Sequence, residues 1–261
     1  MTTFAASAPQ VISGKPKMAW SKLQAKGRVW YRLGGVAIYA HKISEPVKSV
    51  EHAALPSPIA DAPFVRQQEF LAGRKAADKA LKAINIDAPM LPIGDHRSPL
   101  WPEGVTGSIS HKGAWAIACA QRQDVRQYLG VDIEQPLSVG VANAIATVCA
   151  DDDERAYLSR HVRLVLGDKA FHDVGGDNDW ALLITALFSA KESLFKAVYP
   201  AVNQYLEFSD AKLIAWQQEA QVMWFAFQPQ WSTLAKRVWP VYLGQRHGLV
   251  VSLAKGDRPS E

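Results

Sequence analysis

Two carboxylates, Asp132 and Glu134, stand in an apolar run that is typical of a β-strand. Residues two apart on a strand point to the same face, so the pattern predicts that these side chains lie next to each other. Like charges this close repel unless a cation or protons compensate them. Mg²⁺ suits such a pair, because it prefers oxygen ligands and keeps positions for water and substrate phosphates. The spacing alone also fits two surface charges at a strand end.

A second charged group lies in an apolar stretch with helical spacing, residues 180–199. Glu192 and Lys196 are four apart and share a helix face, whereas Lys191 is rotated by about 100° from Glu192. A surface ion pair worth a few tenths of a kcal/mol is the plain alternative. A third carboxylate and two ammonium groups are also what a site for Mg²⁺ and pyrophosphate requires.

Candidate phosphate ligands precede both groups. Ser110 and His111 end a short strand-like run, and a hydroxyl and an imidazole can both donate to phosphate oxygens. Arg74 lies on a predicted helix, and Arg97 stands just before Ser98-Pro99. Taken singly, each also fits a structural histidine or a solvated charge.

The elements that must position these residues can be read from the hydrophobic spacing. Helices are predicted from Phe64 onward, over 139–148, after a capping start at 151–154, and over 180–199, where Pro200 is expected to end the helix. The stretches 46–63, 85–104 and 167–179 are expected to be irregular. The pattern as a whole indicates the α+β class.

Seven short β-like runs complete the pattern. Three precede the second helix and four form the tail, where polar or Pro/Gly turns predict an antiparallel sheet. They cover residues 107–110, 115–120, 128–133, 211–216, 222–227, 238–243 and 249–253.

The composition is that of a folded, globular chain. Of its 261 residues, 48% are hydrophobic and 21% are charged. No run approaches the roughly 20 apolar residues that a membrane helix requires, and the first residues do not read as a secretory signal. Cys119 and Cys149 cannot make a disulfide framework, so we expect buried thiols in the cytoplasm.

Positive charge is concentrated at the start of the chain. Residues 1–44 contain seven Lys or Arg residues and no Asp or Glu. We interpret this segment as a solvated basic leader. An arm for an acidic partner and an organelle-targeting segment are the alternatives.

Four sequence blocks together resemble one family, and a fifth short segment, 99–102, agrees with them. The segments 130–134 (GVDIE) and 188–197 (FSAKESLFKA) resemble the paired signature of phosphopantetheinyl transferases, with Phe188 where many members have Trp. The segment 107–112 (GSISHK) resembles the Ser-x-Ser-His strand of that family. The segments 69–77 (EFLAGRKAA) and 99–102 (PLWP) resemble its enterobactin-synthase-component branch. The leader is longer than the family pattern suggests.

The resemblance implies a fold of two similar α+β halves related by a pseudo-twofold, with the active site at their interface. The chain would then divide into a leader at 1–45, a first half at 46–134 that binds coenzyme A, and a second half at 135–261. Because both halves are fused in one chain, we expect a monomer.

The resemblance also implies a reaction. Mg²⁺ would be held by Asp132, Glu134 and Glu192, while coenzyme A phosphates would be held by Arg74, Arg97, Ser110 and His111. A carrier-protein serine would attack the β-phosphorus, and 3′,5′-ADP would leave. Glu192, directly or through water, is the expected base, and Lys196 together with Lys191 would stabilise the developing charge.

The expected partner is an apo acyl or peptidyl carrier protein that is acidic near its serine. A basic surface should receive it, for which Arg155, Arg160 and Arg163 are candidates, with ordinary helix solvation as the alternative. Fatty-acid, polyketide, non-ribosomal peptide and siderophore carriers all stay open, although the branch favours siderophore or other secondary-metabolite synthases.

Three other functions compete with this interpretation. The first is a non-catalytic module that binds coenzyme A or a carrier protein on the same fold. The second is another Mg²⁺-dependent phosphoryl enzyme, although the sequence shows no second acidic pair and no Gly-rich phosphate loop. The third is a nucleic-acid binder that uses the basic leader, although no zinc-finger spacing supports it.

Overall fold

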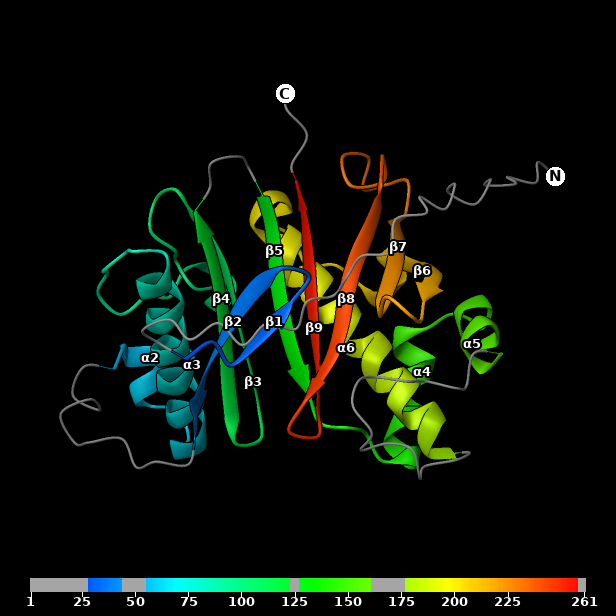
Figure 1. Cartoon of the computed structure of the whole chain (residues 1–261), viewed down its shortest axis with the longest axis horizontal. Coiled ribbons are helices and arrows are strands. Elements are labelled where there is room, and N and C mark those ends of the chain that lie inside the picture. The colour runs from blue at the N-terminus through cyan, green and yellow to red at the C-terminus, as the bar shows by residue number, and fades with distance from the viewer. Residues whose placement is uncertain (1–27, 44–54, 123–126, 161–176, 258–261) are drawn as a thin grey trace.

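The computed structural model describes residues 28–43, 55–122, 127–160 and 177–257 (Figure 1). Within these residues the strands form two antiparallel sheets, in the orders β1-β2-β4-β3 and β5-β9-β8-β7-β6. The first sheet contains β1 (Tyr31–Leu33), β2 (Val36–Lys42), β3 (Val105–Lys112) and β4 (Trp115–Arg122). The second contains β5 (Gln127–Glu134), β6 (Ala211–Gln217), β7 (Val222–Phe227), β8 (Val238–Arg246) and β9 (Leu249–Asp257).

One long helix covers each sheet. The first, α3 (Phe64–Ala83), packs on β2 and β4, and the second, α6 (Asp177–Val202), packs on β5 and β9 (Figure 1). The predicted α+β class is therefore confirmed. The shorter helices are α2 (Ser57–Ala60), α4 (Val139–Cys149) and α5 (Asp152–Ser159), and two 3₁₀ turns are η1 (Asp95–Arg97) and η2 (Phe208–Asp210).

The two sheets pack against each other through alternate residues of β5. Leu129, Val131 and Ile133 join a buried cluster with Ile38 and Ile117 of the first sheet. Strand alternation turns the even-numbered residues of β5, Asp132 and Glu134 among them, to the α6 side. The edges of the two sheets meet where β3 lies beside β5, because the Val131 N–H donates to Ser108 Oγ at 3.0 Å.

Several local predictions are confirmed. The predicted strands all lie within β3 to β9, and the four tail strands pair antiparallel as expected. Helix α5 begins with a capping box, in which Glu154 N donates to Asp151 Oδ1 at 2.9 Å and Asp151 N donates to Glu154 Oε2 at 3.0 Å. None of the helices in the described ranges has both the length and the apolar character that crossing a bilayer needs.

Two predictions about boundaries need correction. Helix α6 continues through Pro200 to Val202, because Pro200 lies in the last turn and the Asn203 N–H still bonds to the Tyr199 carbonyl. The basic leader is not solvated over its whole length, because β2 pairs with β4 and β1 pairs with β2. Residues 1–27 and most of the expected loop at 167–179 lie outside the described residues.

Candidate active site

The carboxylate of Asp132 lies at the junction of the two sheets and is held by three donors. Its side chain comes from β5 and is only 3% exposed. Oδ1 accepts hydrogen bonds from Lys196 Nζ at 2.6 Å and Ser110 Oγ at 2.8 Å. Oδ2 accepts one from Ser189 Oγ at 2.8 Å. Strands β3 and β5 and helix α6 therefore meet at one carboxylate.

A glycine permits this meeting. A Cβ atom on Gly130 would lie 1.9 Å from the Ser193 carbonyl oxygen and 2.6 Å from the Ala197 nitrogen. Only a residue without a side chain lets α6 lie directly on β5 at this point. The close approach brings Lys196, one turn along α6 from Ser193, to Asp132 on the same strand as Gly130.

The second carboxylate of β5, Glu134, has a cation of its own. Lys112 Nζ at the end of β3 lies 2.6 Å from Glu134 Oε2. Burial raises the pKa of Glu134, the hydrogen bond from Lys112 opposes the rise, and the nearby Asp132 carboxylate adds to it. Glu134 therefore belongs to the same electrostatic group as Asp132.

Glu192 is half-buried on α6, one turn before Lys196. Burial raises the pKa of its carboxyl, the Lys196 ammonium opposes this, and Asp132 and Glu134 raise it further. The structure thus brings the three predicted carboxylates within electrostatic reach of one another. Together with Lys112 and Lys196 they form the Asp132 group. A carboxyl with a raised pKa is suited to accept a proton.

The donor set of this group fits Mg²⁺, although its present arrangement does not form a metal cage. Within the described ranges, no three His, Cys, Asp or Glu side chains lie close enough to hold a metal ion. Three carboxylates nevertheless face two ammonium groups, those of Lys112 and Lys196, which leaves an excess of negative charge on hard oxygen ligands. Asp132, Glu134 and Glu192 are thus the residues that could hold such an ion.

His111 lies beside this group and contacts two residues of α3. Its Nε2 is 2.8 Å from Arg66 NH1, and its Nδ1 is 3.6 Å from Glu69 Oε1. Burial lowers the pKa of the imidazole, Glu69 opposes this, and Arg66 and Lys196 lower it further. Sequence reasoning missed Arg66 and gave Glu69 no role, although Glu69 begins the block 69–77 that resembles the family pattern.

Arg74 is buried farther along α3 and binds the loop that follows this helix. Its Nε donates to the Leu91 carbonyl at 2.8 Å, and its guanidinium lies 4.5 Å from the centre of the Phe70 ring. Burial lowers the pKa of Arg74 to about 10, and the charge of Arg66 contributes. Arg74 therefore extends a line of positive charge that begins at Lys196 and passes Arg66.

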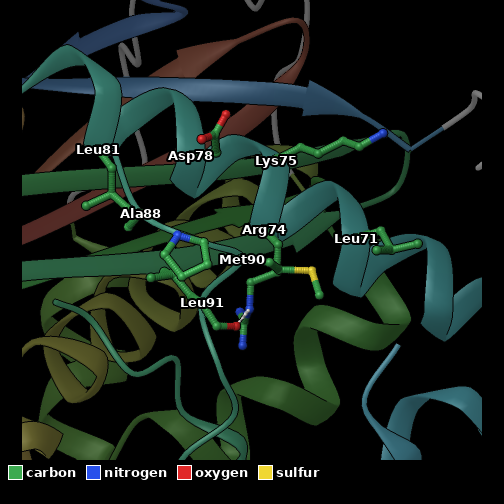
Figure 2. Close-up of a pocket in the computed structure, with 9 residues that line it drawn as sticks. Leu71, Arg74, Lys75, Asp78, Leu81, Ala88, Met90 and Leu91 are labelled. Atoms are coloured by element: carbon green, nitrogen blue, oxygen red, sulfur yellow. Dashed lines mark hydrogen bonds between the residues drawn. The ribbon is translucent and has the colours of Figure 1, made fainter. Parts of the chain in front are cut away.

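Beside Arg74 is a pocket of about 280 Å³ between α3 and the loop at 88–91 (Figure 2). Its walls are mostly apolar, with Leu71 and Leu81 from α3 and Met90 from the loop. Figure 2 shows the Arg74 guanidinium bound to Leu91 at its edge. The pocket shares no lining residue with the Asp132 group, so it is a separate feature of the first half.

Arg97 is exposed in η1, and its predicted role stays a prediction. The backbone of His96 and Arg97 is left-handed, with φ of 53° and 65°, which costs free energy for residues with a side chain. The His96 ring packs edge-on against Tyr199 and Tyr205, at 6.0 and 5.0 Å between ring centres. These contacts hold the turn of the first half against the end of α6.

Lys191 does not reach the Asp132 group. Its ammonium is fully buried, 2.9 Å from Glu154 Oε1, and it donates to the Phe208 carbonyl at 2.9 Å. The rotation of about 100° between neighbouring helix positions turns Lys191 away from the face of Glu192. The prediction that Lys191 stabilises charge in the reaction therefore does not fit its place, where it ties α6 to α5 and η2.

Aromatic side chains continue along α6 on both sides of Glu192. Phe188 and Phe195 pack against Phe208, with ring centres 5.6 and 5.8 Å apart. Nearby, Tyr205 is 71% exposed. Sequence reasoning gave these rings no role, although the spacing of four and three from Glu192 was a usable signal.

Two family profiles match successive parts of the chain. The profile of the 4′-phosphopantetheinyl transferase N-terminal domain matches residues 51–121, and that of the 4′-phosphopantetheinyl transferase superfamily matches residues 128–250. Neither profile includes β1 and β2, and together they include the residues of the Asp132 group.

Three curated relatives illustrate the similarity. Enterobactin synthase component D of Salmonella typhi is 40% identical over 132 residues, which are 51% of this chain and 48% of that protein. The protein of the same name from Escherichia coli is 35% identical over 158 residues, 60% of this chain and 66% of that protein. The 4′-phosphopantetheinyl transferase PptT of Mycobacterium tuberculosis is 30% identical over 150 residues, 57% and 58% of the two chains. The chain thus spans about half the length of the Salmonella relatives that it matches.

Proposed function

Because the chain belongs to the 4′-phosphopantetheinyl transferase superfamily, we propose that it transfers the 4′-phosphopantetheine group of coenzyme A to a serine of an apo carrier protein. The observation that carries the proposal is the bond from Lys196 on α6 to Asp132 on β5, with Glu192 and Glu134 beside it. The proposal is supported because three carboxylates and an ammonium group lie together at the junction of the two sheets.

The nucleotide end of coenzyme A is anionic, and a positive path leads to the Asp132 group. Arg66 contacts His111, whose pKa is also lowered by the charge of Lys196, and Arg74 lies farther along α3 within electrostatic reach of Arg66. We infer that His111, Ser110 and these arginines receive phosphate oxygens, and that Arg97 adds a contact from η1. Binding would require Arg66 to exchange its contact with the imidazole for a phosphate, and Ser110 to give up its bond to Asp132 in order to donate to one.

The chemistry would take place between Glu192 and Lys196. Glu192 accepts the proton of the carrier serine, directly or through water, as the serine oxygen forms its bond to the β-phosphorus of coenzyme A. The bond from that phosphorus to the bridging oxygen breaks, and 3′,5′-ADP leaves. Lys196 donates to the developing negative charge. Bound at Asp132, Glu134 and Glu192, Mg²⁺ would supply further charge neutralisation on the phosphoryl oxygens.

The rings beside Glu192 fit the remaining part of the substrate. The pantetheine arm has apolar methylene and dimethyl groups that gain from contact with an aromatic surface. Phe188 and Phe195 lie one turn before and after the candidate base, which is where an arm attached to the reacting phosphorus would run. We therefore place the arm along this face of α6.

The carrier protein is the second substrate. The names of the relatives favour a carrier of a siderophore synthase or another secondary-metabolite synthase. Arg155 and Arg160 remain candidates for its docking, although Arg155 also donates to the Ala150 carbonyl and pairs with Asp152, and Arg163 lies outside the described residues. Charge reversal at Arg160 is expected to weaken carrier binding without affecting coenzyme A.

We also propose that the protein acts as a monomer in the cytoplasm. One chain supplies the candidate site from both sheets, so a second copy is not needed to complete it. Both cysteines are buried free thiols, as expected in a reducing compartment.

Intact-mass measurement of an apo carrier protein tests the proposal. Incubation with this protein, coenzyme A and Mg²⁺ should add one phosphopantetheine, and a chelator should prevent the addition. The Glu192→Gln variant should still bind coenzyme A but should not transfer the group. Glu103→Gln, which changes an exposed carboxylate in the turn before β3, is the matched control and should transfer normally. Coenzyme A binding without transfer to any carrier class would instead favour a non-catalytic module.

A further inference from the structure

Two buried serines, one on α6 and one on β9, form a row of hydrogen bonds that ends at the Asp132 carboxylate. Ser189 on α6 and Ser252 on β9 have no exposed surface. Ser252 is the cross-strand neighbour of Asp132 in the pairing of β5 with β9. Its Oγ lies 2.8 Å from Ser189 Oγ and donates to the Ser189 carbonyl at 2.7 Å, while Ser189 Oγ lies 2.8 Å from Asp132 Oδ2.

The number of hydroxyl protons determines which way the hydrogen bonds run between these serines and Asp132. An ionised carboxylate only accepts hydrogen bonds, so the single proton of Ser189 is donated to Asp132. The contact between the two hydroxyls can then only use the proton of Ser252, which is shared between the oxygen atoms of Ser189. Each donor is polarised by the one before it, and the chain runs from Ser252 through Ser189 to Asp132.

The same count shows which carboxylate atom stays available. Oδ1 of Asp132 already has two donors, Lys196 and Ser110. Oδ2 has one described donor, Ser189, and a carboxylate oxygen offers about two acceptor positions. One acceptor position on Oδ2 is therefore left for a further ligand, and the Ser189 hydroxyl determines how that oxygen is oriented.

We propose that Ser189 and Ser252 are positioning residues that orient Asp132 Oδ2 for a divalent cation. This inference rests on the proposed function, because it concerns the same carboxylate. It adds Ser252, which lies outside every sequence block that resembles the family, and a role for the Ser189 hydroxyl. Removing groups that orient a metal ligand typically weakens metal affinity about 10–100-fold.

Mn²⁺ binding to the full chain, with and without saturating coenzyme A, tests the inference. Mn²⁺ can be followed by its electron paramagnetic resonance signal, which does not depend on turnover. Ser189→Ala should weaken Mn²⁺ binding about 10–100-fold. Ser252→Ala should weaken it less, because Ser189 can still donate to Asp132. In both variants the Mg²⁺ concentration for half-maximal transfer should rise.

The other serine of α6, Ser193, provides the matched control. Ser193 is equally buried, but its hydroxyl donates to the Ala190 carbonyl within the helix and has no described link to Asp132. Ser193→Ala should keep Mn²⁺ affinity within about twofold, whatever its effect on stability, because its bond is internal to α6. If Ser189→Ala does not fold, the Mn²⁺ affinity of Ser252→Ala compared with that of Ser193→Ala still tests the inference. Ser252 contacts Ser189 and not the carboxylate, so a loss in Ser252→Ala alone must act through Ser189.

The outcomes separate this inference from the proposed function. Equal Mn²⁺ affinity in all four proteins, an equal loss in Ser193→Ala, or a wild-type chain that binds no Mn²⁺ would overturn the positioning role. Transfer by the wild type alongside equal affinities would leave the proposed function intact. If the Mn²⁺ affinities follow the expected order but the wild type transfers nothing, the positioning role is retained and the proposed transferase function is rejected.

Discussion

Lys196 Nζ lies 2.6 Å from Asp132 Oδ1, although the two residues are 64 positions apart in the chain. The carboxylate is nearly inaccessible, whereas the lysine side chain is 31% exposed. The bond therefore joins a buried charge to one that can still meet a substrate. It connects α6 to β5 at the point where β3 contributes Ser110.

Replacement of this lysine tests both of its contributions. Lys196→Met keeps the length of the side chain and leaves Asp132 with the hydroxyls of Ser110 and Ser189. We expect the free energy of unfolding to fall by about 1.5–3 kcal/mol, the range for a hydrogen bond to a charged group. Transfer should fall further than the folded fraction does. Urea unfolding and the mass assay measure the two effects, and unchanged transfer would contradict the assignment.

Gly130 provides a test of how α6 is placed. Gly130→Ala would put a Cβ 1.9 Å from the Ser193 carbonyl, so the helix must move away from β5. We expect the free energy of unfolding to fall by about 3 kcal/mol, as for overpacking of a rigid backbone contact. Because Lys196 moves with the helix, transfer should fall as well.

Gly140→Ala is the control for Gly130→Ala. Nothing lies within 4 Å of a Cβ at Gly140, which is exposed in the first turn of α4. The substitution should leave transfer unchanged and raise the free energy of unfolding by up to about 1 kcal/mol, since alanine loses less backbone entropy in a helix. Equal behaviour of the two variants would mean that the contact of Gly130 with α6 does not matter.

Local patterns were sufficient to predict most elements. The spacing of apolar residues located α3, α4 and α6, and alternation located β3 to β9, because these elements bury one face against a large core. The same alternation placed Asp132 and Glu134 on one face of a strand. The ends of the helices were less predictable. Pro200 does not end α6, because a proline in the last turn removes only one helix hydrogen bond.

Predictions failed where a side chain had a choice of long-range partners. The basic composition of residues 1–44 concealed β1 and β2, although β2 pairs with β4 and β1 pairs with β2. Lys191 stands beside Glu192 in the sequence, but its partner Glu154 is 37 positions away. Arg66 and Ser252 gave no signal, since their significance comes from His111 and Ser189, which only the fold brings near.

The buried ion pair of Lys191 and Glu154 should stabilise the fold. Lys191→Met leaves a buried carboxylate that still accepts the N–H groups of Leu213 and Asp151. We expect a loss of about 3 kcal/mol, the lower end for breaking a buried pair, because these two donors remain. Urea unfolding measures the loss. Transfer per folded molecule that falls a hundredfold or more would instead restore a role for Lys191 in the reaction.

An exposed ion pair on α3 is the control for the buried pair of Lys191 and Glu154. Lys82 and Asp78 lie 2.9 Å apart, but their side chains are 57% and 43% exposed. Lys82→Met should change the free energy of unfolding by less than about 1 kcal/mol, because solvent screens an exposed pair. A similar loss in both lysine variants would show that burial does not set the strength of the Lys191 contact.

The two thiols should be unreactive in the native protein and linked to stability at high pH. Burial raises the pKa of Cys119 to about 12 and that of Cys149 to about 11. Since the thiolate is the reactive form, a disulfide reagent at pH 8 should modify neither cysteine until denaturant is added. Thiols in the unfolded chain ionise near pH 8.5, so folding favours the neutral form and the free energy of unfolding should decrease as the pH rises above about 8.5. The double variant Cys119→Ala, Cys149→Ala should lose that decrease, and rapid modification of the native wild type would contradict the buried placement of these side chains.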